Sequence, residues 1–137
     1  KFFGNSVAQI FKDSGEAHFR NLEEKVFCEL FESGPHIISS GGGTILSARA
    51  RKIISNRSYS IWLKSDEEKI LSRINKNNNR PLLSTSNPSR VLKLLLKERG
   101  KFYCKADFHL ENGEKSIENL VIEITDKLIR EKVLTHE

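Results

Sequence analysis

The sequence of 137 residues predicts an α/β fold, a three-layer α/β/α sandwich with a parallel sheet in its middle layer. Two observations support this prediction. Short apolar runs of strand length alternate along the chain with longer segments whose apolar residues recur at helical spacing. Gly41, Gly42 and Gly43 separate the first such run from the next helical segment, at the kind of strand end where open α/β folds bind ligands. We therefore expect residues 1–137 to form a single domain with a ligand site at these glycines.

Residues 1–34 are expected to be helical. Ser6-Val7-Ala8-Gln9 is an S-x-x-Q capping box, which opens a short helix that Gly15 would end. A longer helix is expected from Glu16 to Ser33, because its apolar residues recur every three or four positions. Gly34-Pro35 would then stop this second helix.

Three segments have the length and composition of strands, and the first of them is expected to be buried. These segments are His36 to Ser40, Tyr59 to Leu63 and Phe108 to Glu111. A doubly wound sheet usually has more than three strands, so the sheet is expected to be incomplete at its front end. The chain also begins with Lys1 and contains no methionine, and we expect it to be a processed, cut or incomplete protein.

The remaining helices follow from capping signals and apolar spacing. They are expected over Ser47 to Ile54, from a capping box at Ser65-Asp66-Glu67-Glu68 to about Ile74, from Asn87-Pro88 to about Tyr103, and, after a turn at Asn112-Gly113, from Ile117 to Arg130. Residues 75–88 interrupt this pattern with a polar, turn-forming stretch. A loop of that length inside a domain is either disordered or a functional lid.

The composition excludes several classes of protein. The net charge of +5 comes from basic residues interleaved with acidic ones, and no nucleic-acid-binding motif is present, so no nucleic-acid partner is expected. No apolar run approaches the roughly 20 residues that span a bilayer, and no secretory signal is visible. Cys28 and Cys104 lack metal-ligand spacing. We expect a cytoplasmic protein that binds neither a membrane nor a metal through these residues.

Four features are candidates for chemistry. Arg20 and Glu23 share one helical face, Gly41 to Gly43 form a turn, Arg80 lies in the lid-like loop, and Arg99 precedes Tyr103 by one helical turn. Taken alone, each has an ordinary structural explanation: a surface ion pair, a flexible turn, a solvated arginine and an arginine on an exposed helix face. The residues by themselves leave these alternatives open.

Taken together, these segments resemble shikimate kinases. Ser6 to Phe11, Gly15-Glu16 with Phe19-Arg20-x-x-Glu23, Ile38 to Gly43, Arg80-Pro81-Leu82-Leu83 and Arg99-x-x-x-Tyr103 occur in the order and spacing of that family. The resemblance implies a nucleoside-monophosphate-kinase-like P-loop fold. It also implies transfer of the ATP γ-phosphate to the 3-hydroxyl of shikimate, with Mg²⁺, in the pathway that makes chorismate and the aromatic amino acids. A monomer is expected by the same resemblance.

The resemblance assigns roles to individual residues. Arg20 and Arg99 would clamp the carboxylate of shikimate, Glu23 would hold an arginine or a substrate hydroxyl, and Gly41, Gly42 and Gly43 would lie against the ring. The helices of residues 1–34 would bind the substrate. On the lid, Arg80 would stabilise charge on the transferred phosphoryl group, and Arg73 would join this ATP-binding cluster. Residues 112–115 would contact the adenine.

The sequence also departs from the family. No G-x-x-x-x-G-K-[ST] motif and no D-x-D-like segment is present. We therefore expect the first strand, the P-loop and the following helix, with the Mg²⁺ ligands, to be missing, and these 137 residues alone to be inactive. Three alternatives remain: a shikimate-kinase-like protein that binds a ligand or partner without catalysis, a basic nucleic-acid-binding domain, and a kinase for another small metabolite such as gluconate. The Arg20–Glu23 and Arg99–Tyr103 pairs favour shikimate over gluconate.

Overall fold

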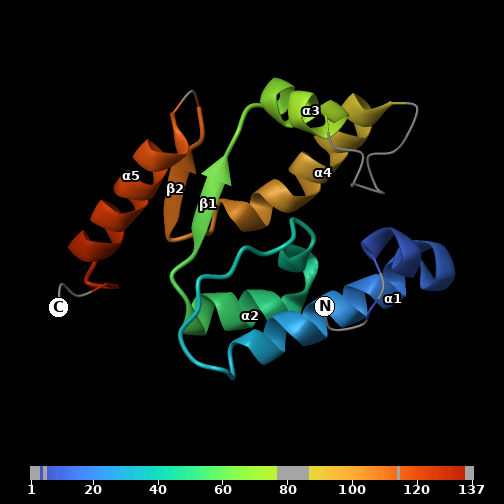
Figure 1. Cartoon of the computed structure of the whole chain (residues 1–137), viewed down its shortest axis with the longest axis horizontal. Coiled ribbons are helices and arrows are strands. Elements are labelled where there is room, and N and C mark those ends of the chain that lie inside the picture. The colour runs from blue at the N-terminus through green and yellow to red at the C-terminus, as the bar shows by residue number, and fades with distance from the viewer. Residues whose placement is uncertain (1–3, 5, 77–86, 114, 135–137) are drawn as a thin grey trace.

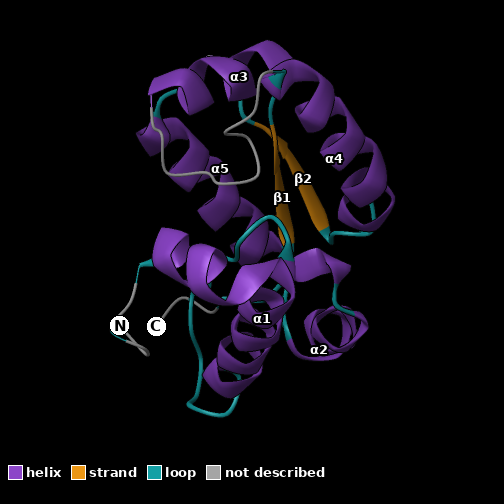
Figure 2. Ribbon diagram, turned by 90° about the vertical axis from the view of Figure 1, so that its right-hand side faces the viewer, coloured by secondary structure: helices purple, strands orange, loops and turns teal. Residues whose placement is uncertain are grey.

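The computed structural model describes residue 4 and residues 6–76, 87–113 and 115–134 (Figure 1). Its elements follow the order α1 (Val7–Leu30), the short 3₁₀ helix η1 (Thr44–Leu46), α2 (Ala48–Arg57), β1 (Ile61–Lys64), α3 (Glu67–Lys76), α4 (Pro88–Tyr103), β2 (Phe108–Glu111) and α5 (Ile117–Arg130). The strands β1 and β2 are parallel, with Ile61 opposite Phe108 and Lys64 opposite Glu111. Figure 2 shows the two strands between α5 and α4, which is the layered arrangement expected from the sequence.

The first helix begins and bends where the sequence predicts. The Ser6 hydroxyl accepts a hydrogen bond from the Gln9 amide, 3.1 Å away. The Gln9 side chain bonds to Asp13 instead of closing the capping box. Gly15 has a φ of 77°, so two helical segments meet there at a kink. The second segment ends at Leu30, earlier than predicted, because the Ser33 hydroxyl donates to the Leu30 carbonyl and the chain turns toward Gly34.

The prediction of a buried strand from His36 to Ser40 is wrong in this structure. The segment has no regular secondary structure, and the Ile37 side chain is fully exposed, at 105%. A strand exists only through backbone bonds to a neighbour. Within the described part of the chain, β1 pairs with β2 and no backbone hydrogen bond joins residues 36–40 to either strand. Apolar composition alone is therefore not enough to form a strand at residues 36–40.

The later elements agree closely with the prediction. The Asn87 side chain caps α4 by accepting from the Arg90 amide, and Pro88 occupies the first turn. The strand β2 and the helix α5 have the predicted bounds. The sequence predicts the start of α3 at Ser65, which is one residue too early. In the structure α3 begins at Glu67, and the Asp66 carbonyl accepts the first hydrogen bond of the helix, from the Ile70 amide. Residues 77–86, which include most of the predicted lid and Arg80, lie outside the described residues.

One apolar cluster lies between α3 and α4, and further buried apolar residues lie on α1, α2 and β2. Leu92 of α4 is buried among apolar residues of both helices, and Leu110 of β2 is 1% exposed. The helix α5 has no fully buried residue, and Ile117, Val121 and Ile122 on it are each more than half exposed. Among the described residues, no helix is long and apolar enough to cross a membrane.

Candidate functional site

The glycine triplet forms a tight turn that the structure places against side chains of α1 and α4. The Thr44 amide donates to the Gly41 carbonyl and the Leu46 amide to the Gly43 carbonyl, each over 3.0 Å, so the turn leads directly into η1. Gly43 has an ordinary φ of −91°, and none of the three glycines has a positive φ. Backbone conformation therefore does not explain why glycine occupies these positions.

Close approach of other side chains explains the glycines. A Cβ on Gly43 would lie 2.1 Å from the Arg20 guanidinium, and one on Gly41 would lie 2.4 Å from the Glu23 carboxylate. A Cβ on Gly42 would lie 3.1 Å from Arg99 Nη1 and 3.3 Å from the Tyr103 hydroxyl. The space that a side chain would fill is thus occupied by the charged ends of residues from two helices. Glycine is needed at these three positions because a Cβ there would crowd the side chains that pack against the turn.

The α1 side of the site is an ion-pair network. Arg20 Nη1 lies 2.7 Å from Glu23 Oε2, and Arg20 Nη2 lies 3.2 Å from Glu16 Oε1. The spacings of three and four residues place all three side chains on one face of the helix. The Arg20 and Glu23 side chains are 25% and 18% exposed, so this pair is partly shielded from water. The Arg20 guanidinium is therefore oriented before any ligand arrives.

The α4 side of the site contributes Arg99 and Tyr103. The Tyr103 hydroxyl donates to the Gly42 carbonyl over 2.7 Å, and its ring stacks on Trp62 of β1 with centroids 5.7 Å apart. Burial raises the pKa of the Tyr103 phenol, against the opposing effect of Arg99, so the hydroxyl is a proton donor at neutral pH. The Arg99 Nε is buried and has no hydrogen-bond partner among the described residues. Such an orphaned donor is costly unless something pairs with this guanidinium.

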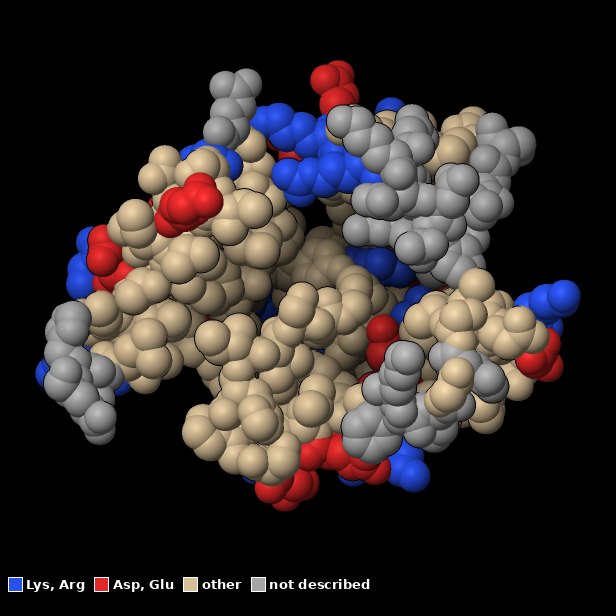
Figure 3. Space-filling model, in the orientation of Figure 1, with Lys and Arg blue, Asp and Glu red and all other residues tan. Residues whose placement is uncertain are grey.

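A cleft of about 720 Å³ opens beside the turn. Its lining includes Gly41, Gly42, Trp62, Arg99 and Tyr103. The space-filling view shows a hollow in this face of the molecule, with basic and acidic side chains visible inside it (Figure 3). Of the two arginines at the turn, Arg99 lines this cleft, while Arg20 lies at the adjacent glycine and is paired with Glu16 and Glu23. Guanidinium groups beside carboxylates suit a small anionic ligand that also carries hydroxyl groups.

The structure brings together most of the predicted site residues. Arg20, Glu23, Gly41, Gly42, Gly43 and Arg99 meet at one turn although they come from three separate parts of the chain. Arg73 is exposed on α3, and no hydrogen bond or ion pair among the described residues joins it to this group. Arg80 lies outside the described residues. No group of three or more His, Cys, Asp or Glu residues that could hold a metal ion occurs in the described ranges.

Sequence reasoning missed three contributors. Glu16 pairs with Arg20 and could have been found from its spacing of four residues. Trp62 supports Tyr103, and its position inside a strand gave no sign of that contact. Arg51 donates to the carbonyls of Ile45 and Leu46 in η1, next to the turn, and its position on a basic helical segment gave no sign of these contacts.

Comparisons with known proteins agree with this geometry. The shikimate kinase family model matches residues 1–129. The chain is 34% identical over 125 residues to a shikimate kinase of Mesorhizobium japonicum, covering 91% of this chain and 62% of that protein. It is 38% identical over 127 residues to one of Nitrobacter winogradskyi, covering 93% of this chain and 59% of that protein. The chain thus spans about three-fifths of the length of these curated relatives.

Solved structures show the same fold. The shikimate kinase of Acinetobacter baumannii in complex with shikimate superposes with a TM-score of 0.90 at 30% identity, covering 96% of this chain and 74% of that one. The shikimate kinase of Aquifex aeolicus gives a TM-score of 0.75 at 33% identity, covering 96% of this chain and 75% of that one. These likenesses confirm the predicted α/β class.

Proposed function

This chain belongs to the shikimate kinase family, and on that premise we propose that the protein transfers the γ-phosphate of ATP to the 3-hydroxyl of shikimate. The step belongs to the biosynthesis of chorismate and the aromatic amino acids. One observation carries the proposal: Arg20, Glu23 and Arg99 converge on the glycine turn, as binding of a hydroxylated carboxylate requires. We also propose a single domain, a monomer and a cytoplasmic location.

The two arginines would bind the shikimate carboxylate in different ways. Arg20 is already held by Glu16 and Glu23, so it presents a fixed charge at little entropic cost on binding. The buried Nε of Arg99 has no partner in the described part of the chain, so a carboxylate that reached it would satisfy this one donor. Bidentate pairing of a guanidinium with a carboxylate supplies both energy and orientation.

The glycine turn and Glu23 would orient the ring and its hydroxyls. In this proposal the ring lies against the backbone of Gly41, Gly42 and Gly43, beside the charged groups that already fill the space next to these glycines. The Glu23 carboxylate can accept from a hydroxyl while it still holds Arg20. Fixing the acceptor hydroxyl relative to the incoming phosphoryl group is a large part of what such a kinase must do.

On the nucleotide side, we propose that Arg80 stabilises charge on the transferred group and that Arg73 contributes to ATP binding. The residues of this sequence do not include a G-x-x-x-x-G-K-[ST] motif, and those described do not cluster as metal ligands. Mg²⁺ belongs to the proposed reaction as a cofactor that neutralises phosphate charge when bound. The site described here is the shikimate side.

The proposal is tested on the natural protein as its gene encodes it. Formation of ADP and phosphorylated shikimate is measured with shikimate, and with gluconate as the competing substrate. Shikimate affinity is measured separately by calorimetry in the wild type, in Arg99→Ala and in Arg90→Ala, an exposed arginine on the same helix. We expect turnover with shikimate alone and binding that only Arg99→Ala weakens. Binding without turnover would support the non-catalytic alternative, and turnover with gluconate alone would refute the proposal.

The lid assignment is tested by Arg80→Ala. If Arg80 acts on the transferred phosphoryl group, kcat should fall by more than the shikimate KM rises, because the interaction is strongest in the transition state. Unchanged turnover would remove Arg80 from the phosphate site.

A further inference from the structure

One arginine outside the predicted site touches both halves of it. Arg51, on α2, donates through Nη1 to the carbonyl of Ile45 over 2.9 Å and to that of Leu46 over 2.7 Å. Its guanidinium carbon also lies 4.1 Å from the centre of the Phe102 ring on α4. A single side chain thus joins α2, η1 and α4. It is partly buried, so neither contact is made in bulk water.

Both ends of this connection lead directly to the substrate site. The 3₁₀ helix η1 begins next to Gly43, and the Leu46 amide returns to the Gly43 carbonyl. Phe102 stands on α4 beside Tyr103, whose hydroxyl is bonded to the Gly42 carbonyl. Moving η1 relative to α4 would therefore change the separation of Gly42 from Arg99 and Tyr103.

The chemistry of this contact requires arginine. The planar guanidinium can donate to two carbonyls in its plane while its face stacks on an aromatic ring. A lysine at the same position keeps the charge but provides a point-like ammonium on a flexible stem, and it cannot stack in the same way. Loss of the guanidinium would also leave the carbonyls of Ile45 and Leu46 without this donor.

We propose that Arg51 is a positioning residue that fixes the glycine turn against α4 and thereby sets the affinity for the substrate carboxylate. The substrate in this statement rests on the proposed function. The positioning itself rests on the contacts of Arg51 and applies to any ligand held between Arg20 and Arg99. The Arg51 side chain also lines the cleft, but its guanidinium is engaged by the Ile45 and Leu46 carbonyls and by the Phe102 ring. In this proposal it acts through Gly42, Arg99 and Tyr103.

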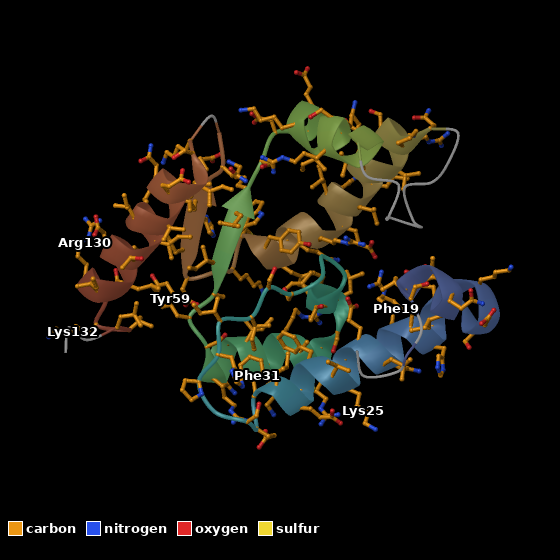
Figure 4. All side chains as sticks on the ribbon, in the orientation of Figure 1. Phe19, Lys25, Phe31, Tyr59, Arg130 and Lys132 are labelled. Atoms are coloured by element: carbon orange, nitrogen blue, oxygen red, sulfur yellow. The ribbon has the colours of Figure 1, made fainter. Side chains whose placement is uncertain are left out.

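The same helix offers a matched control. Arg57 also donates to a backbone carbonyl, that of Phe31 over 2.7 Å, and its guanidinium carbon lies 5.9 Å from the centre of the Phe31 ring. It pairs in addition with Glu32. These contacts fasten α2 to the far end of α1, and Figure 4 shows Phe31 well separated from Phe19, which neighbours Arg20. Arg57 therefore makes the same kinds of contact without touching the turn.

The experiment compares Arg51→Lys with Arg57→Lys in the natural protein. The shikimate Kd, the shikimate and ATP KM values, kcat and Tm are measured for both. We expect Arg51→Lys to raise the shikimate Kd and KM about tenfold, since small displacements of positioning groups have effects of this size or larger. The ATP KM and kcat should change less than about twofold. Arg57→Lys should lower Tm about as much as Arg51→Lys does, and it should leave the shikimate Kd and KM unchanged.

A second variant and a second measurement keep the inference separable from the proposed function. Phe102→Leu removes the stacking ring and keeps Arg51, and should raise the shikimate Kd about threefold, in line with the size of a cation–π contact. Hydrogen–deuterium exchange of residues 41–47 without ligand should be faster in Arg51→Lys than in Arg57→Lys. If the wild type does not bind shikimate, faster exchange in Arg51→Lys alone still supports positioning. Equal shikimate constants, or equal exchange, in Arg51→Lys and Arg57→Lys would overturn it.

Discussion

The glycine turn and the segment just before it differ sharply, although they are neighbours in the sequence. In the turn, Gly43 is buried and Thr44 is 4% exposed, whereas in the preceding segment Ile37 is 105% exposed. The turn is built from small and polar residues and the segment contains two isoleucines, so hydrophobicity alone would predict the opposite. What separates them is the availability of partners.

The turn is held by side chains from three helices. Arg20 and Glu23 approach it from α1, Arg51 from α2, and Tyr103 from α4. Residues 36–40 have no backbone bond to a strand in the described part of the chain. The geometry of the glycine turn is therefore set by contacts with helices, independently of any strand formed by residues 36–40.

The largest effect is expected when the α1 anchor is removed. Arg20→Ala should weaken shikimate binding about a hundredfold or more, because it removes a charge-assisted pair and leaves Glu23 without its partner. ATP binding should remain nearly unchanged. Calorimetric titration with each ligand measures both. Lys25→Ala is the control, since Lys25 lies on the same helix with its side chain 69% exposed (Figure 4).

Two results would contradict this assignment. An equal loss of shikimate and ATP binding in Arg20→Ala would show a general loss of structure. An equal loss of shikimate binding in Lys25→Ala would show that the charge of α1 matters and the contact at the turn does not.

A smaller effect is expected when the turn itself is filled. Gly43→Ala places a methyl group 2.1 Å from the Arg20 guanidinium, so the arginine must move while the backbone can stay in place. We expect the shikimate Kd to rise about tenfold, with Tm lowered by only a few degrees. Gly113→Ala is the control, because nothing lies within 4 Å of a Cβ at that position and its φ is not positive. Affinity unchanged in Gly43→Ala would mean that Arg20 adapts freely and is not fixed by the turn.

Removal of one hydrogen bond at the turn should have a still smaller effect. Tyr103→Phe deletes the donor to the Gly42 carbonyl and keeps the stacking on Trp62. A lost hydrogen bond of this kind costs about 1 kcal/mol, so the shikimate Kd should rise about fivefold. Burial raises the pKa of this phenol, so wild-type affinity should show no step from Tyr103 between pH 7 and pH 9. Such a step, absent in Tyr103→Phe, would contradict the assignment of a neutral donor.

Hydrogen exchange tests the other side of the comparison. In a protein of these 137 residues, the amides of Ile37 and Ile38 have no backbone acceptor among the described residues and should exchange at nearly unprotected rates. The Thr44 amide, bonded to the Gly41 carbonyl, should exchange more slowly. Exchange followed by NMR or mass spectrometry measures this difference. Protection of Ile37 and Ile38 equal to that of Thr44 would restore the buried strand expected from the sequence.

Local signals in the sequence predicted the helices well. The caps Ser6 and Asn87 and the kink at Gly15 involve residues within a few positions of each other, and they were found where expected. The strand at residues 36–40 failed because its formation depends on a partner distant in the sequence. The approach of Arg99 and Tyr103 to Gly42 depends equally on distant contacts, and it was expected only through the family resemblance. Arg51 escaped notice because its partner Phe102 is 51 positions away, the difference between their residue numbers.

The smallest effect concerns a link that β1 possesses and residues 36–40 lack. Asp107 lies just before β2 and Ser60 lies just before β1. The Asp107 carboxylate accepts from the Ser60 hydroxyl over 2.6 Å and from the Ser60 amide over 2.8 Å. These bonds hold the pKa of Asp107 below its ordinary value.

A carboxyl whose pKa is lower when folded stabilises the fold above its unfolded pKa, near 4, and loses that contribution as the pH falls through its folded pKa. Because the group is largely exposed, the contribution should be a few tenths of a kcal/mol. Asp107→Asn should therefore be slightly less stable than the wild type at pH 7, and this gap should shrink as the pH falls through the lowered pKa of Asp107. Urea unfolding over a series of pH values from 7 downward measures the difference, and a constant gap between the two proteins would show that Asp107 contributes packing and no charge-dependent hydrogen bond.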